Sequence, residues 1–369
     1  MRWLGFTLLA AGCVAAACWG PAQLWPTTAA PDGVYGRAGD GPSGLALLSA
    51  QAEKGALQAD VPRPASAANP PSPASPPVTA VAEPFLPEVA EAACTTLLPR
   101  LPGLSRAQCV ATRLQASGAL SRQGAPLYWR DVPTHAGAAA KGQPAAEPLR
   151  VLVVGAMHGD ELTAASLALR WIGMAAAEGA ADAGEPAPVH WRFIPVLNPD
   201  GLLAPKPTRV NAGGVDLNRN FPTPGWAEEA PVYWEKRTRK DPRRWPGHTP
   251  LSEPESRFLH QQMDQFQPQL VVSIHAPYGV LDFDGPHDPP LRLGRLRMDK
   301  LGVFPGSLGH YGGLHRGVPV VTIELEHALR MPPDAEVRAM WRDLRHWMNT
   351  RLLEGADAVA GVKPPGLRR

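Results

Sequence analysis

The stretch that decides the fold is "VLVVGAMHGDEL", residues 151–162, in which an apolar run ends in a turn carrying His158 and Glu161. A continuous apolar run of this length is typical of a strand that is covered on both faces of its sheet. Taken alone, the H-x-x-E spacing is more often a polar turn after a core strand than a metal site. The rest of the chain must therefore show whether these two side chains have partners.

Further apolar runs alternate with helical patterns after residue 126. The predicted strands are "LRVLVVGAM" (149–157), "HWRFIPVL" (190–197), "PQLVVSIHA" (268–276) and "VPVVTIEL" (318–325). The predicted helices cover about 161–178, 253–266 and 334–353. This alternation predicts an α/β fold, a three-layer α/β/α sandwich around a mixed, mostly parallel central sheet.

Three of the four predicted strands end in side chains that can bind a metal. His158 and Glu161 follow the first strand, His275 ends the third and Glu324 ends the fourth. Because open α/β sheets bind ligands at the carboxyl ends of their strands, we expect these residues to meet. Two histidines and one carboxylate with an open fourth position form a catalytic zinc site. The sequence therefore predicts one Zn²⁺ per chain.

Composition limits the class of protein and its partners. The chain has 369 residues, is 44% hydrophobic and carries 36 basic against 34 acidic residues. This near balance removes the main reason to expect a nucleic-acid partner. The 43 prolines are more than twice ordinary usage, so part of the chain should not pack into a core. We expect a signal segment (1–20), a Pro/Ala-rich disordered tether (21–83), a small helical segment (84–125), a catalytic domain (126–354) and a flexible tail (355–369).

The N-terminus has the pattern of an export signal. Arg2 precedes a short apolar run that ends in small residues, too short for a full membrane span. We expect export to the periplasm or cell envelope, either with plain cleavage or with a lipid anchor on Cys13 or Cys18. In an exported protein, Cys94 and Cys109 are expected to form a disulfide between two short helices. The sequence does not indicate an oligomeric state.

Two polar loops lie between the predicted ligands. They are "NPDG" (198–201) and "NAGGVDLNRNFP" (211–222), and the second carries Asn218 beside Arg219. A guanidinium next to an amide suits bidentate binding of a carboxylate, although such a pair alone is more often a solvated surface turn.

Six motifs occur in the order seen in zinc carboxypeptidases of the pancreatic carboxypeptidase superfamily. They are H-G-D-E, N-P-D-G, G-V-D-L-N-R-N-F-P, S-E-P-E, S-I-H and T-I-E-L, over about residues 145–330. The short loops resemble the murein peptide amidase A branch of that superfamily. The resemblance implies zinc ligands His158, Glu161 and His275, and a catalytic Glu324.

The resemblance also implies how a peptide substrate is held. Asn218 and Arg219 would bind its terminal carboxylate, and Arg209 would face the scissile carbonyl oxygen. Asp160 departs from the pattern, because the pancreatic enzymes carry a substrate-binding arginine at this position. Their mobile active-site tyrosine also has no clear match, and Tyr278 and Tyr311 fit better as wall residues near the site.

The resembled branch cleaves the bond between γ-D-glutamate and diaminopimelate in murein peptides. Asp282 and Asp284 could bind the second ammonium of diaminopimelate, or they could be simple turn residues before Gly285. The basic stretch "YWEKRTRKDPRRWPG" (233–247) could edge the substrate groove, although a solvated loop is the commoner explanation.

Two other functions compete with this hypothesis. A zinc deacylase of the succinylglutamate desuccinylase or aspartoacylase type has a related fold and metal site, but S-E-P-E and the intact GVDLNRNFP favour a peptidase. An envelope binding protein that had lost activity would be expected to lack Glu324, which is present.

Overall fold

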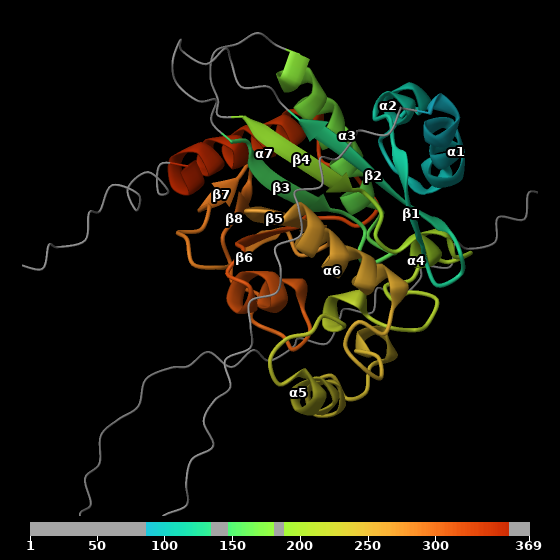
Figure 1. The fold of residues 1–369 in the computed structure, drawn as a ribbon, viewed down its shortest axis with the longest axis vertical. Helices are drawn as coiled ribbons and strands as arrows, with labels where there is room; N and C mark the ends of the chain where they lie inside the picture. The colour runs from blue at the N-terminus through green and yellow to red at the C-terminus, as the bar shows by residue number, and fades with distance from the viewer. Residues whose placement is uncertain (1–85, 134–146, 181–187, 354–369) are drawn as a thin grey trace, which may run out of the picture. The chain divides into compact units, whose positions relative to one another are not determined.

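A mixed sheet with strand order β1-β2-β4-β3-β5-β9-β6 forms the centre of the protein (Figure 1). The structure is a computed structural model that describes residues 86–133, 147–180 and 188–353. The strands of this sheet are β1 (Gln115–Leu120), β2 (Pro126–Pro133), β3 (Leu149–Val154), β4 (Val189–Ile194), β5 (Leu270–His275), β6 (Val280–Asp284) and β9 (Val320–Glu324). The hairpin strands β7 (Arg292–Leu293) and β8 (Leu296–Arg297) form a separate small sheet.

The four strands predicted from the sequence form the parallel middle of the sheet. Strands β4, β3, β5 and β9 pair in parallel, and β1, β2 and β6 complete the edges in antiparallel pairs. Every residue of β5 is buried, as expected for a central strand with both faces covered. The parallel pairing brings the carboxyl ends of β3, β5 and β9 to one edge of the sheet.

Helices cover both faces of the sheet and make three layers. Helices α3 (Leu162–Ala180) and α7 (Asp334–Trp347) lie on one face, and α6 (Pro254–Phe266) lies on the other (Figure 1). Side chains of β3 alternate between two cores: Val151 and Val153 pack on the α3 side, whereas Leu152 and Val154 pack on the α6 side. The predicted three-layer α/β fold is therefore confirmed.

The antiparallel edge strands were not predicted. Residues of β1 alternate between half-buried and exposed, and β6 carries two aspartates among five residues, so neither shows an apolar run. Strand β1 lies within the range 84–125 that we had assigned to the helical segment, yet it belongs to the same sheet as the predicted catalytic domain.

The helical segment before β1 braces the sheet. Helices α1 (Pro87–Leu97) and α2 (Arg106–Ala111) are joined by the disulfide between Cys94 and Cys109, as expected. Ser105 caps α2 in a capping box, and Leu97 packs into the core on the α3 side. Arg100 donates a hydrogen bond of 2.8 Å to the carbonyl of Ala204, so this segment also supports the loop before Arg209.

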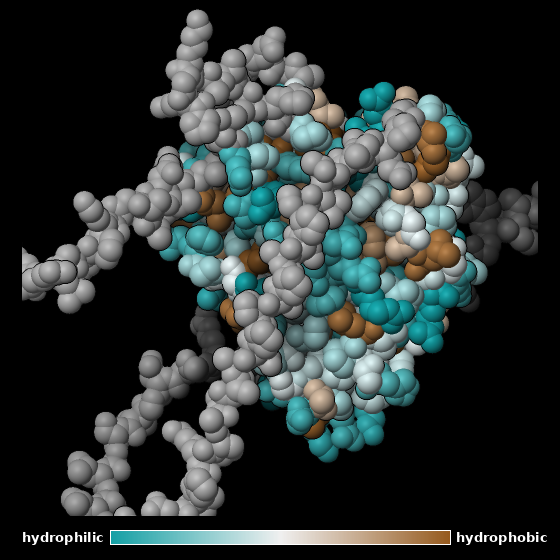
Figure 2. Space-filling view, in the orientation of Figure 1, coloured by the Kyte–Doolittle hydropathy of each residue, from teal (hydrophilic) through white to brown (hydrophobic). Residues whose placement is uncertain are grey.

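The remaining helical elements are short and lie mostly in the long connections. They are η1 (Leu98–Arg100), α4 (Pro199–Leu203), η2 (Leu217–Arg219), α5 (Trp226–Val232), η3 (Tyr233–Arg237), η4 (Pro242–Arg244), η5 (Gly309–His315) and η6 (Met348–Leu353). The face that bears α6 is largely hydrophilic, with scattered apolar side chains (Figure 2). In the described ranges, no helix combines the length and apolar character needed to cross a membrane. The predicted signal segment, tether and tail lie outside the described residues.

Candidate metal centre and active site

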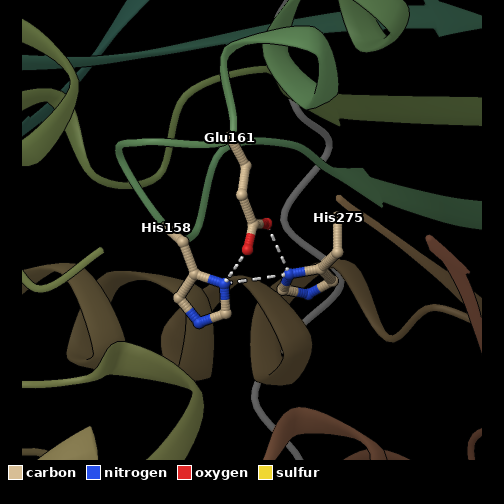
Figure 3. Close-up of side chains that lie close together, drawn as sticks. All are labelled: His158, Glu161 and His275. Atoms are coloured by element: carbon tan, nitrogen blue, oxygen red, sulfur yellow. Dashed lines mark hydrogen bonds and ion pairs between the residues drawn. The ribbon is translucent and has the colours of Figure 1, made fainter. Parts of the chain in front are cut away.

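The three predicted ligands converge at the carboxyl edge of the sheet (Figure 3). The Nδ1 atom of His158 lies 2.7 Å from Glu161 Oε1, and the Nδ1 atom of His275 lies 2.9 Å from Glu161 Oε2. The two Nδ1 atoms are 3.2 Å apart, and the candidate ligand atoms of the triad lie within 4.8 Å of one another. All three side chains are buried. Two imidazole nitrogens and one carboxylate therefore point at one small space.

Backbone geometry explains why these side chains meet. His158 and Glu161 occupy the turn between β3 and α3, and His275 ends the neighbouring strand β5. Gly159 lets this turn pack on the N-P-D-G loop, because a β-carbon there would lie 2.2 Å from the carbonyl carbon of Gly201. The H-G-D-E and N-P-D-G motifs thus fit against each other directly.

The second nitrogen of each histidine has its own partner, and neither partner was singled out from the sequence. His158 Nε2 lies 3.1 Å from Asp216 Oδ1, and His275 Nε2 lies 2.9 Å from Ser273 Oγ. A carboxylate only accepts hydrogen bonds, so Asp216 favours a proton on Nε2 of His158, and with a metal between Nδ1 and Glu161 this tautomer leaves the Nδ1 lone pair for the metal. Asp216 therefore selects the tautomer that a ligand needs.

The carboxylates around the histidines are held in the ionised form. Burial alone would raise the pKa of Glu161, but His158 and His275 together lower it below its usual range. Burial likewise opposes ionisation of Asp216, whereas Arg209 and His158 hold its pKa well below the usual value. A negative charge is thus available both on the ligand carboxylate and on the residue that orients His158.

Glu324 ends strand β9 directly beside His275, its partner in the parallel register of β5 and β9. It is buried, and its Oε2 has no hydrogen-bond partner among the described residues. Burial, and then the nearby charge of Glu161, raise the pKa of Glu324 to about 8. A carboxylate with a free oxygen and a raised pKa is suited to accept and return a proton near neutral pH.

Arg209 reaches the triad from the loop that follows α4. Its Nη1 lies 3.2 Å from His158 Nδ1 and 3.7 Å from Glu161 Oε1, while its Nε donates to Asp216 Oδ2 at 3.0 Å. Asn198 of the N-P-D-G motif donates to the backbone carbonyl of Arg209 at 3.2 Å. The guanidinium therefore stands next to the metal ligands, where a scissile carbonyl oxygen would develop charge.

Asn218 and Arg219 lie in η2, two and three residues after Asp216. The Asn218 side-chain oxygen accepts from the backbone N–H of Leu308 at 2.8 Å, and its side-chain N–H₂ group has no hydrogen-bond partner among the described residues. Arg219 is buried, its guanidinium stacks 4.5 Å from the centre of the Phe304 ring, and its Nε has no hydrogen-bond partner among the described residues. Donors of both residues remain available for a carboxylate.

The two acidic candidates on β6 differ from each other. Asp282 is buried and accepts from the backbone N–H of Phe283 at 2.9 Å. Asp284 is half-buried, has no hydrogen-bond or ion-pair partner in the described ranges, and its pKa is raised to about 6 by burial and by Asp282. A β-carbon on Gly309 would lie 2.0 Å from Asp284 Oδ2, so this glycine makes room for the carboxylate.

The two tyrosines near the site have different surroundings. Tyr278 is 61% exposed and follows His275 by three residues. Tyr311 is buried in the core on the α6 side, stacks on Phe221, and its hydroxyl lies 2.5 Å from His260 Nδ1. Tyr278 is therefore placed at the rim of the site, and Tyr311 belongs to the core.

The S-E-P-E motif supports the loop that carries the substrate candidates. Asn211 donates from its amide to Glu253 Oε2 at 2.7 Å and to Glu255 Oε2 at 3.0 Å. Arg122 from the β1–β2 turn also donates to Glu253 at 2.9 Å. Asn211, Glu253 and Glu255 are all buried, and we call these three residues the Asn211 clamp. The clamp fixes the start of the 211–219 loop.

These residues fit a zinc ion. The donor set is two histidines and a carboxylate, each histidine is oriented through its second nitrogen, and Glu324 keeps an unpartnered oxygen beside the triad. Structural zinc sites usually close all four positions with protein ligands, whereas this set leaves one open.

Comparison with known proteins agrees with this geometry. Residues 111–284 match the family model described as zinc carboxypeptidase. Murein peptide amidase A of Escherichia coli K12 is 34% identical over 164 residues, which cover 43% of this chain and 57% of that protein. The homologue from Vibrio campbellii is 33% identical over 146 residues, which cover 35% of this chain and 54% of that protein. The chain thus spans a little over half the length of these relatives.

Two solved structures are also similar to this chain. Murein-tripeptide amidase MpaA from Escherichia coli O157 is 25% identical, with a TM-score of 0.41 over 68% of this chain and 93% of that one. Carboxypeptidase A from Helicoverpa armigera is 15% identical, with a TM-score of 0.47 over 70% of this chain and 74% of that one. The match of the family model and the motifs assembled at this site thus agree in making residues 111–284 similar to zinc carboxypeptidases.

Proposed function

We propose that the protein is a zinc-dependent carboxypeptidase or amidase that hydrolyses a C-terminal amide bond in murein peptides, of the γ-D-glutamyl–diaminopimelate type. The observation that carries the proposal is the convergence of His158, Glu161 and His275 beside an unpartnered, buried Glu324. One zinc ion per chain would be held by the three ligands. When bound, zinc supplies Lewis-acid activation of water and of the scissile carbonyl.

Side chains of the protein supply proton transfer, charge stabilisation and positioning. Glu324 takes a proton from the attacking water and returns it to the leaving amine, because its free oxygen and raised pKa suit both steps. Arg209 stabilises the negative charge that develops on the carbonyl oxygen; removing one such donor typically costs about 10²–10³ in rate. Asp216 holds both Arg209 and His158 in place for this role.

Substrate binding follows from the charges around the site. Asn218 and Arg219 bind the terminal carboxylate through their free donors, which makes the enzyme act at a C-terminus. Asp284 binds an ammonium on the side chain of the terminal residue, whereas Asp282 is buried and its Oδ1 accepts from the backbone N–H of Phe283. The names of the relatives support a murein peptide as substrate, and the exposed Tyr278 would line its path.

The cellular location is part of the proposal. The predicted export signal and tether would place the enzyme in the periplasm or at the cell envelope, where cell-wall peptides occur. Membrane contact would come only through a lipid anchor on Cys13 or Cys18.

Mass spectrometry of a digest tests the proposal. The tripeptide L-Ala-γ-D-Glu-diaminopimelate is incubated with wild type and with Glu324→Gln, each with and without a metal chelator. Release of diaminopimelate by wild type alone, abolished by the chelator, is the expected result. Glu326→Gln, an exposed glutamate two residues later, serves as the matched control and should act like wild type. Trimming of ordinary peptides without release of diaminopimelate would refute the murein substrate, and turnover of neither would refute the peptidase assignment.

A further inference from the structure

The end of the basic stretch 236–244 contacts the loops that form the active site. Arg243 Nη2 lies 2.8 Å from Oδ2 of Asp160, the residue between two candidate metal ligands. One residue beyond the stretch, the carbonyl of Trp245 accepts a hydrogen bond of 2.8 Å from the backbone N–H of Asp216. Asp160 and Asp216 belong to the two loops that build the metal centre. The end of the basic stretch is therefore fixed at the site by contacts on both sides of Arg244.

Arg244 has only a weak partner of its own. Its Nε lies 3.6 Å from Asp241, and its side chain is 34% exposed. It is also close enough to Arg219 to lower the pKa of that guanidinium, after burial and together with Arg209. Arg219 thus lies in the positive field of both Arg209 and Arg244. Such an arrangement is costly without an anion and favourable with one.

The positive charge of Arg209, Arg219 and Arg244 exceeds what one terminal carboxylate of the substrate requires. In the proposed function, Asn218 and Arg219 bind that carboxylate and Arg209 faces the scissile carbonyl, so Arg244 has no assigned group. Asp216 already binds Arg209, and Asp160 already binds Arg243, so neither is left to neutralise Arg244.

We propose that Arg244 is a specificity-determining residue that binds a second carboxylate of the substrate, in addition to the terminal carboxylate held by Asn218 and Arg219. This inference rests on the proposed function. A murein tripeptide has two such groups: the α-carboxylate of its γ-linked D-glutamate, and the distal carboxylate of diaminopimelate. The shared chemistry is a carboxylate near the scissile amide, recognised by a guanidinium.

Matched substrates decide which carboxylate is bound. The first is the full tripeptide, the second has the glutamate α-carboxylate converted to an amide, and the third ends in lysine, which lacks only the distal carboxylate. Values of kcat/KM are measured for wild type, Arg244→Gln and Arg237→Gln, with Arg237 being an exposed arginine of the same stretch.

We expect wild type to lose about tenfold in kcat/KM on the peptide that lacks the recognised carboxylate, as for loss of one charge-assisted hydrogen bond. Arg244→Gln should lose a similar factor in kcat/KM on the full tripeptide. This variant should then cleave the full tripeptide and the peptide that lacks the recognised carboxylate equally well. Arg237→Gln should keep the preference of wild type. Arg244→Lys, which keeps the charge, should retain part of the preference and provides a second variant if the glutamine variant folds poorly.

Several outcomes would overturn the inference. It is wrong if Arg244→Gln slows all three peptides by the same factor, or if wild type cleaves all three equally well; the hydrolase assignment would then stand. Failure of wild type to cleave any of the three peptides would instead refute the proposed function, and the inference with it.

Discussion

Replacing Asp216 by asparagine tests how the protein prepares His158 for a metal. Asp216 is fully buried; its Oδ1 accepts from His158 Nε2 and from the backbone N–H of Asn218, and its Oδ2 accepts from Arg209. An asparagine keeps one acceptor and gains an N–H₂ group in place of the other. Whichever way the amide turns, either His158 or Arg209 then faces a donor instead of an acceptor.

The magnitude follows from these contacts. Loss of a carboxylate that orients a metal-binding histidine typically costs about 10–100-fold in metal affinity, or about 1.4–2.7 kcal/mol. Removing one partner of a buried ion pair such as Asp216–Arg209 typically lowers the free energy of unfolding by about 3–5 kcal/mol. We therefore expect Asp216→Asn to bind zinc at least about tenfold more weakly and to be less stable without metal.

Competition with a chromophoric chelator measures the zinc affinity, and denaturant unfolding of the metal-free protein measures the stability. Asp131→Asn is the matched control, because Asp131 binds Arg192 through both oxygens at 2.7 and 2.6 Å on strand β2. This control should lose stability but keep its zinc affinity. A zinc affinity of Asp216→Asn close to that of wild type would show that the orientation of His158 does not depend on Asp216.

Other changes have outcomes that the structure also predicts. Replacing Cys94 and Cys109 by alanine opens a bridge of sequence separation 15 and should lower the free energy of unfolding by about 3 kcal/mol in denaturant titrations. Burial raises the pKa of Glu255, so the unfolded state loses this proton first as pH rises and wild-type stability falls. The stability of Glu255→Gln relative to wild type should therefore rise as pH increases above about 4.3, the ordinary pKa of glutamate, and a difference that stays constant with pH would contradict this reasoning. Asp284→Asn should lower kcat/KM about tenfold for substrates ending in an ammonium-bearing side chain and leave neutral side chains unaffected, whereas equal loss on both would argue against ammonium binding.

The middle of the fold and the metal triad could be predicted because they depend on simple rules. Apolar runs of Val, Ile and Leu become central strands, and parallel strands bring their carboxyl ends to one edge. Those two rules were sufficient to expect His158, Glu161, His275 and Glu324 at one place, although 117 positions separate the two histidines. The edge strands β1 and β6 could not be predicted by these rules, because β1 is half-exposed and β6 is interrupted by aspartates.

Residues that orient the triad could not be found from spacing. Asp216 is 58 positions from His158, and Arg243 is 83 positions from Asp160, so no local pattern connects either pair. Asp216 lies inside a motif in which Asn218 and Arg219 had the more obvious chemistry. The basic stretch contains enough charge to suggest a solvated loop, and only the packed structure shows that its end reaches the site.

The residue that orients His158 and the arginine proposed to bind the substrate lie on the same loop, residues 209–219. The 209–219 loop carries Arg209, Asp216 and Arg219, and the Asn211 clamp with Glu253 and Glu255 fixes its start. A shift of this loop would move the carboxylate that orients His158 together with the guanidinium that binds a substrate carboxylate. Zinc affinity and substrate affinity should therefore fall together when the clamp is damaged, whereas a change at Arg219 itself should weaken only substrate binding. The clamp is thus the place where a substitution far from the chemistry would impair both halves of the active site.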